Sequence, residues 1–308
     1  MVTPGELIEL MLDAPVALAA MSEHAGLLPV AFGLDEPEPS AAEVDDRIAV
    51  AVARVGRQSF GEMVAVAVEV GSLRVGPWIS DAPEALRVAY GHAERLRPLA
   101  EAIVGRFFEQ LVQPVQLDRQ QWWTCYPADY EPHRLFENYD DVYGDGELTW
   151  AGLRTVTDPP DEAHGALVTA WELDWPPVTR WHLPVRADAR VHEIRSPRDW
   201  VELIRRYPHG SRGGPDWAAI AADLDAVHLT WSGFLTTEGR TLGDAVLPLQ
   251  YWFSERTLWL HDVFGDPEPL GPPVLDERFG PDYGVDVRTD AGREAFDRRV
   301  LARHLGRG

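Results

Sequence analysis

Hydrophobic positions in the first 115 residues recur mostly at helical spacing. Thr3 and Glu6 have the spacing of a capping box ahead of an apolar stripe, which predicts a helix that runs to about residue 20. Ser40 and Glu43 repeat this pattern and predict a second helix. This part of the chain is therefore expected to be mainly helical.

Two segments in this first region have other patterns. Residues 62–70 and 72–78 alternate in polarity and are rich in valine, so we expect a pair of strands that turns at Gly71. A long helical region should follow from residue 81 to 112, interrupted at Pro98.

The pattern changes after Pro114. Eleven of the twelve tryptophans lie beyond this residue, and short runs of alternating polarity replace the helical stripe. Such runs predict strands at 148–156, 166–175, 179–185 and 190–195.

Two helices interrupt this run of strands. Ser196 and Asp199 predict a helix start, and Pro208 ends that helix. A second, short helix carries Trp217 and Leu224. Three more strands should follow, at 226–235, 245–253 and 257–264.

These elements together predict an α+β protein. A helical N-terminal third with a small strand pair precedes a Trp-rich, mostly antiparallel sheet with two inserted helices. The corresponding regions are 1–115 and 116–308, either as two domains or as one continuous domain.

Composition excludes several classes of protein. The chain has no lysine, so a Walker-type ATP site, a pyridoxal phosphate enzyme and a Schiff-base aldolase are all argued against. Fifty carboxylates against 28 arginines give a net charge of −22, which opposes binding to nucleic acid and to anionic membranes. A small cationic molecule or a basic protein is the partner that this charge favours, and the abundance of tryptophan also suits an aromatic molecule.

The single cysteine, Cys125, narrows the chemistry further. One thiol permits no internal disulfide, no iron–sulfur cluster and no cysteine-based zinc site. The acidic N-terminus does not resemble a signal peptide, and no apolar run approaches the roughly 20 residues of a membrane span. We therefore expect a soluble, cytoplasmic protein.

The stretch around Cys125 has residue types that suit a reaction centre. Cys125 and His133 could form a nucleophile and its base, or Cys125 could be a small buried side chain beside Trp122 and Trp123. Downstream, Asp145-Gly146 is typical of a hairpin turn, and the acids near it do not have the spacing of an EF-hand calcium loop.

A sharper candidate site combines three residues of the C-terminal sheet. If residues 186–189 form a turn, His182 faces Glu193 as a cross-strand pair. His228 lies on the polar face of a later strand and could join them. The catalytic residues of this hypothesis are His182, Glu193 and His228, in a general acid–base role without a metal; the alternative is that each histidine is a half-buried strand residue with a structural hydrogen bond.

A second set of residues resembles the ADP-ribosyltransferases. Arg195 ends a predicted strand, a strand with Thr236 and Thr237 follows two helices, and Glu255 comes last, which is the order of the arginine, serine-threonine-serine and glutamate elements of that family. The resemblance covers about sixty residues and departs from the family in the triplet and in the residues around the glutamate. It implies that Arg195 holds the dinucleotide and that Glu255 stabilises the oxocarbenium-like centre, with Thr237 as the third residue of this alternative site.

The sequence thus favours an enzyme that acts on a small molecule by His/Glu acid–base chemistry. The alternative from a different class is a non-catalytic acidic interaction protein, of the inhibitor or immunity type, that docks on a basic partner. An ADP-ribosyltransferase-like enzyme is a further alternative.

Overall fold

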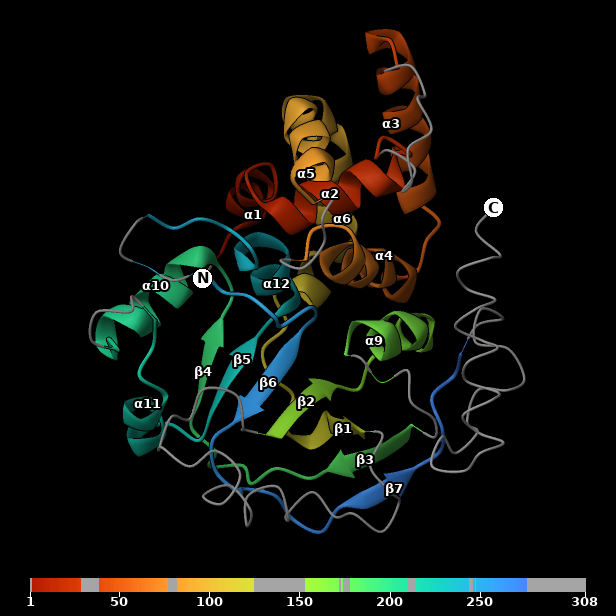
Figure 1. Cartoon of the computed structure of the whole chain (residues 1–308). Helices are drawn as coiled ribbons and strands as arrows, with labels where there is room; N and C mark the ends of the chain where they lie inside the picture. Colours follow the sequence, from red (N-terminus) through yellow and green to blue (C-terminus); the bar gives the residue numbers. More distant parts are fainter. Residues whose placement is uncertain are drawn as a thin grey trace, which may run out of the picture.

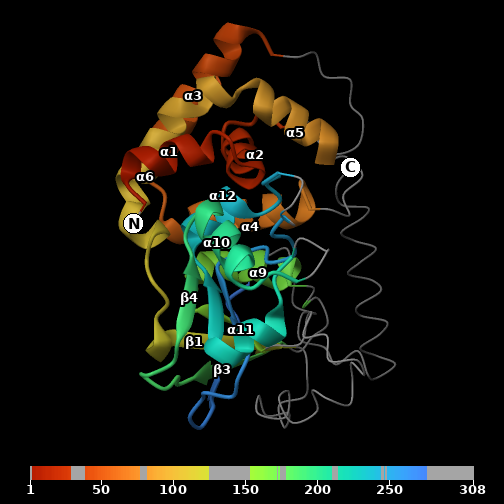
Figure 2. The ribbon, with the colours of Figure 1, turned by 90° about the vertical axis from the view of Figure 1, so that its left-hand side faces the viewer.

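A layer of helices lies on one side of a curved sheet in the computed structural model of the chain (Figure 1). The structure describes residues 2–28, 39–76, 82–124, 153–171, 173, 178–209, 214–243, 246 and 248–275. Figure 2 shows the helices of the first 111 residues above the strands, with α12 between the two. The α+β class predicted from the sequence is confirmed.

The described residues of the N-terminal region form six α-helices, and the capping boxes at Thr3 and Ser40 lie where the sequence predicts them. Thr3 and Ser40 each accept a hydrogen bond from the backbone N–H of a glutamate three residues later, and that glutamate bonds back. The predicted first helix is two helices, because Pro15 begins a new one. The six are α1 (Pro4–Met11), α2 (Pro15–His24), α3 (Ala41–Val55), α4 (Phe60–Leu73), α5 (Ala82–Gly91) and α6 (Arg97–Leu111).

The predicted strand pair at 62–70 and 72–78 is wrong, since α4 occupies most of it. Helix α4 packs against both α2 and α9 (His164–Ala170), so apolar residues surround it and no helical stripe is visible in its sequence. Its helical signal is the capping box of Ser59 and Glu62.

In the part of the chain that the structure describes, the sheet has seven strands in the order β4-β5-β6-β2-β1-β3-β7. All neighbouring strands are antiparallel except β4 and β5, which are parallel and are connected through helices α10 (Pro197–Arg206) and α11 (Trp217–Asp223). The strands are β1 (Gln120–Thr124), β2 (Leu153–Thr157), β3 (Thr179–Leu183), β4 (Val191–Ile194), β5 (Ala226–Leu229), β6 (Arg256–Trp259) and β7 (Glu268–Leu270).

Three predicted strands differ from the structure. Residues 166–175 overlap helix α9 instead, and residues 226–235 divide into β5 and helix α12 (Trp231–Thr237). The described part of 245–253 contains no strand. The predicted hairpin at Asp145-Gly146 and the predicted closing helix after residue 290 lie outside the described residues.

The two faces of the sheet bury different clusters. One face, here called the helix face, contributes Val156, Val227 and Leu258 to a large core shared with the helices of the N-terminal region. The opposite face, here called the far face, holds a smaller apolar cluster of Trp122, Leu153, Leu183, Ala226, Trp259 and Val263. Because one core contains residues from both predicted regions, the division at residue 115 stays a prediction.

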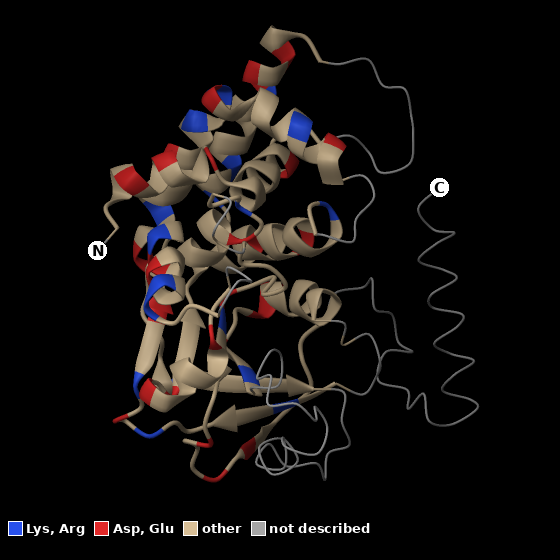
Figure 3. Cartoon of the chain, turned by 60° about the vertical axis from the view of Figure 1, so that its left-hand side comes forward, with Lys and Arg blue, Asp and Glu red and all other residues tan. Residues whose placement is uncertain are grey.

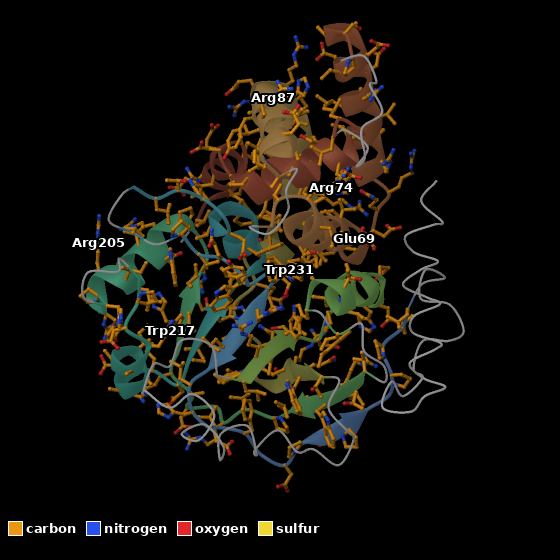
Figure 4. The ribbon with its side chains drawn as sticks, in the orientation of Figure 1. Glu69, Arg74, Arg87, Arg205, Trp217 and Trp231 are labelled. Atoms are coloured by element: carbon orange, nitrogen blue, oxygen red, sulfur yellow. The ribbon has the colours of Figure 1, made fainter. Side chains whose placement is uncertain are left out.

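Helix α12 is the element that joins the helices to the sheet. All seven of its residues are buried, and its N-cap Thr230 accepts a hydrogen bond from the backbone of Gly233. A Cβ at Gly233 would lie 2.0 Å from the backbone oxygen of Ile194, so only glycine permits this approach to β4. Trp231 lies near the centre of the molecule in Figure 4, with its ring edge-on to Phe60 of α4.

No helix among the described residues combines the length and the apolar character needed to cross a membrane.

We expect Gly233→Ala to lower the free energy of unfolding by about 3 kcal/mol, because the added methyl group collides with rigid backbone rather than with a movable side chain. Urea unfolding followed by circular dichroism measures the change. Gly105→Ala is the matched control: Gly105 is exposed within α6 and an added Cβ meets nothing within 4 Å, so this variant should be slightly more stable than the natural protein. An unchanged stability of Gly233→Ala would contradict the close approach.

Candidate functional site

A row of polar side chains crosses the far face of the sheet. The strand register places Glu193 beside His228, His228 beside Thr257, and Thr257 beside Thr155. Two residues away along each strand, the next row on this face is apolar and consists of Val191, Ala226, Trp259 and Leu153. The polar residues therefore form a line at the upper boundary of the small apolar cluster, and we call them the polar row.

His228 and Glu255 form the buried centre of this arrangement. Their side chains are 1% and 3% exposed, and His228 Nδ1 lies 3.6 Å from Glu255 Oε1. His228 Nδ1 also shares a hydrogen bond of 2.9 Å with the hydroxyl of Thr257. Glu255 directly precedes β6, and its contact with His228 places it on the same face as Thr257. Residues two apart on extended chain are expected to share a face.

Burial drives both groups towards their neutral forms. It lowers the pKa of His228 to about 3, with a further decrease from the nearby Arg195 guanidinium. Burial raises the pKa of Glu255 to about 8, although hydrogen bonds from Thr157 act in the opposite direction. At neutral pH the contact is thus one between a carboxylic acid and a neutral imidazole, not an ion pair.

A directed chain of hydrogen bonds ends on Glu255. The indole N–H of Trp259 donates to Thr155 Oγ1 (2.8 Å), whose hydroxyl donates to the side-chain oxygen of Gln120. The amide N–H of Gln120 donates to Thr157 Oγ1 (3.1 Å). The hydroxyl and backbone N–H of Thr157 then donate to the two carboxyl oxygens of Glu255, at 2.8 and 3.1 Å. These bonds fix the position of the Glu255 carboxyl group within the sheet.

The polar row becomes accessible at its β4 end. The Glu193 side chain is 15% exposed and that of Arg195 is 34% exposed, and the two form an ion pair. The backbone N–H of Val115 donates to Glu193 Oε1 at 3.0 Å. The side chains thus progress from a partly exposed ion pair at the sheet edge to a fully buried His/Glu pair.

His182 does not join this group, so the predicted His182–Glu193 pair is wrong. Strands β3 and β4 are five positions apart in the sheet, which corresponds to roughly 24 Å at about 4.8 Å per strand. His182 is paired in register with Gln121, whose neighbours Gln120 and Trp122 point to the far face, so His182 points to the opposite face. Its nitrogens bond to Glu268 and to the backbone oxygen of Asp118 instead. Of the three residues of the first hypothesis, only Glu193 and His228 are neighbours.

The structure contradicts the middle element of the resemblance to ADP-ribosyltransferases, the strand with Thr236 and Thr237. The segment with Thr236 and Thr237 is the end of helix α12 and not a strand. Thr237 Oγ1 is buried without a hydrogen-bond partner in the part of the chain that the structure describes. Arg195 and Glu255 do lie at the ends of β4 and β6, and both act on His228, a residue that the resemblance does not include.

The helix face of β6 carries a second buried charged group, which the sequence did not reveal. Arg256 is 3% exposed, and its guanidinium carbon lies 3.9 Å from the centre of the Trp171 ring. Burial lowers the pKa of Arg256, Arg154 on the neighbouring strand β2 lowers it further, and Glu238, directly after α12, raises it. Consecutive residues at the start of β6 therefore place a carboxyl group on one face of the sheet and a guanidinium on the other.

The described residues offer no group of three or more His, Cys, Asp or Glu side chains that could hold a metal ion. Cys125 and His133, the other nucleophile and base considered above, lie outside the described residues.

Glu255→Gln should become progressively more stable than the natural protein as the pH rises. The folded pKa of Glu255, about 8, exceeds its ordinary value of 4.5, so its stabilising contribution is complete below pH 4.5 and is lost as the pH rises through 8. Glutamine has no proton to lose, so the difference in unfolding free energy between variant and natural protein should shift in favour of the variant, on the order of 4 kcal/mol between pH 5 and 9.

Chemical denaturation at a series of pH values measures this difference. Glu109→Gln, which removes an exposed carboxyl group from α6, serves as the control for the general effect of one charge. A difference for Glu255→Gln that follows the control at every pH would rule out a buried acid at this position.

No protein-family model, curated protein or solved structure matches this chain. The chemistry of the polar row and of the His228–Glu255 pair is therefore the basis on which a function can be assigned.

Proposed function

We propose that the protein is an enzyme that acts on a small molecule and that His228 and Glu255 transfer protons in the reaction. The observation that carries this proposal is their contact: two fully buried ionisable groups, 3.6 Å apart, whose pKa values are displaced in opposite directions. Strongly displaced pKa values of this kind are concentrated at functional sites.

The two residues have complementary roles at neutral pH. A Glu255 carboxyl group that keeps its proton up to about pH 8 is a general acid. The carboxylate that forms when this proton leaves lies 3.6 Å from His228 and raises the pKa of the imidazole, which is then able to accept a proton. The hydrogen bonds from Thr157 hold the acid in place and stabilise the carboxylate that forms once the proton has left. The pair can therefore give and recover a proton without a change in side-chain position.

The β4 edge is the side from which a substrate would approach. Arg195 is partly exposed there, lies close enough to lower the pKa of His228, and forms an ion pair with Glu193. A polar substrate group that competes for Arg195 would be brought towards the imidazole. Glu193 and Arg195 are thus assigned to substrate positioning and the buried pair to proton transfer.

Replacement of either buried residue should abolish most of the activity. A screen of the purified protein against chromogenic esters, amides, phosphoesters and glycosides identifies a turnover assay. In that assay His228→Gln and Glu255→Gln should each lower kcat by about 100- to 10,000-fold, which is the usual contribution of a general acid or base.

His182→Gln is the matched control, because His182 is a hydrogen-bonded histidine on the opposite face of the same sheet. It should keep full activity. Near-normal activity of both buried-pair variants, with thermal unfolding that shows them to be folded, would contradict the proposal and assign the pair to stability alone.

The net charge supports a second candidate, an acidic protein that docks on a basic partner without catalysis. Many carboxylates on the described helices are paired with arginine, as in Glu9–Arg97, Asp45–Arg95 and Glu84–Arg87, and Figure 3 shows both charges interspersed there. Residues 125–152 carry seven carboxylates and one arginine and thus hold a large share of the excess. Docking of this type would depend on long-range attraction.

Binding to a poly-arginine peptide tests this candidate. Affinity should fall at least about ten-fold between 50 and 500 mM salt, because salt screens exposed charges. Replacement of Asp140, Asp141, Asp145 and Glu147 by their amides should weaken binding more than the same change at Glu9, Asp45 and Glu84. Binding that is insensitive to salt and to both sets of substitutions would exclude the docking role.

A further inference from the structure

The side chain of Arg256 has buried hydrogen-bond donors that the described residues do not satisfy. Its exposed fraction is 3%, and neither Nε nor Nη2 has a hydrogen-bond partner in the described part of the structure. Burial of a guanidinium group is costly, and each unsatisfied donor adds to that cost. Native proteins rarely retain such donors unless water, an ion or another bound group satisfies them.

The two unsatisfied atoms are the pair that can bind one anion side-on. In a planar guanidinium group the N–H of Nε and one N–H of Nη2 point in the same direction. Two oxygens of a single carboxylate or phosphate match this spacing and accept both hydrogen bonds in parallel. Arg256 therefore presents a complete side-on recognition edge and not two unrelated donors.

The surroundings fix this edge in place. The Trp171 ring stacks on the guanidinium at 3.9 Å, and the indole N–H of Trp171 donates to Ser254 Oγ at 3.1 Å. The hydroxyl of Ser254 donates in turn to the backbone oxygen of Glu255, at 2.9 Å. Arg256 is thus preorganised by the Trp171 ring, which is itself held by the residues directly before β6.

The balance of charge around Arg256 favours the binding of an anion. Arg154, a second guanidinium on the helix face, lies close enough to lower the pKa of Arg256 further, after burial. The neighbouring carboxyl groups do not fully compensate for the two cations, since burial raises the pKa of Glu238 to about 7 and that of Glu255 to about 8. At neutral pH the positive charges around Arg256 therefore outweigh the negative ones.

Glu238 supplies a complementary polar atom. The backbone N–H of Trp252 donates to its Oε1 at 3.1 Å, whereas its buried Oε2 has no partner among the described residues. Tyr251 and Phe253 on either side of Trp252 have positive φ angles of 69° and 61°, which are strained for aromatic residues. The chain tolerates this strain in the segment that holds Glu238, and a protonated Oε2 could donate to an oxygen of a bound anion.

We infer that Arg256 forms an anion-binding site on the helix face, which takes a small carboxylate or phosphate group side-on through Nε and Nη2, with Trp171 stacked on the guanidinium and Glu238 as the second polar contact. This site lies on the opposite face of β6 from the His228–Glu255 pair. It is therefore independent of the proposed catalysis.

Thermal unfolding and isothermal titration calorimetry of the full chain test the site, with sodium acetate and sodium phosphate as probes. Sodium chloride at the same ionic strength is the reference, because chloride offers no pair of oxygens. Acetate or phosphate should raise the Tm in a saturable manner and bind with a measurable Kd; which of the two does so identifies the class of ligand.

Arg256→Lys keeps the charge but removes the side-on edge, and it should weaken binding by about 10- to 100-fold, the loss expected for one charge-assisted hydrogen bond. His228→Gln, on the other face, should bind the probe like the natural protein. Equal effects of acetate, phosphate and chloride would contradict the anion-binding site, and so would binding by Arg256→Lys that equals binding by the natural protein. In either case water or Glu238 would satisfy the donors of Arg256.

Nuclear magnetic resonance of the natural protein keeps the test independent of whether Arg256→Lys folds. The Nε–H resonance of Arg256, assigned by its absence from Arg256→Gln or by its contact with the Trp171 ring, should shift saturably with the same Kd as in calorimetry. A resonance that does not respond to either probe would refute the inference.

Discussion

The rest of the structure depends on one constraint: two consecutive ionisable residues, Glu255 directly before β6 and Arg256 as its first residue, are buried where the strand begins. Strand β6 is covered on both faces, and the alternation of extended chain sends Glu255 to the far face and Arg256 to the helix face. Neither group can reach bulk water without removal of the strand from the centre of the sheet. Each must therefore be made compatible with burial by its local partners.

The two faces solve this problem differently. On the far face, Thr157 and the hydrogen bonds behind it hold a carboxyl group that keeps its proton, beside a histidine that stays neutral. On the helix face, a tryptophan ring covers a guanidinium that cannot become neutral in the same way, and part of its hydrogen-bonding capacity is left unused. The Glu255 carboxyl group is thus satisfied by its neighbours, whereas the Arg256 guanidinium is prepared for a ligand.

Helix α12 makes this burial possible. Gly233 lets the helix approach β4 without a side chain between them, and the following residues lead directly to Glu238. The same chain then returns through the strained segment around Trp252 to the start of β6. Residues close in sequence to α12 thus include Glu238, Glu255 and Arg256.

Local sequence signals predicted the helix caps and several of the strands. The capping boxes at Thr3 and Ser40 and the strands β3 and β4 were found, because their polar and apolar residues separate by face. Helices α4 and α12 were predicted as strands, since elements buried on all sides have no polar face from which to read a period.

The candidate site shows the same limit. His228 was chosen for its place on a polar face, and its contact with Glu255 depends on strand order, which the sequence alone does not determine. The His182–Glu193 pair failed for that reason: two strands that are close in sequence lie near opposite ends of the sheet. The alternation through Ser254, Glu255, Arg256 and Thr257 was a usable signal, because two charges beside an apolar run mark a strand that must satisfy both on separate faces.

The protonation state of Glu255 tests the account most directly. A titration of the glutamate side-chain carboxyl groups by carbon-13 nuclear magnetic resonance, with the Glu255 signal assigned by its loss in Glu255→Gln, follows this single group in the natural protein. The account predicts a midpoint near pH 8, where burial outweighs the hydrogen bonds from Thr157. A midpoint at or below the ordinary value of 4.5 would contradict it, because Glu255 would then be a buried carboxylate at neutral pH and could not act as the acid of the pair.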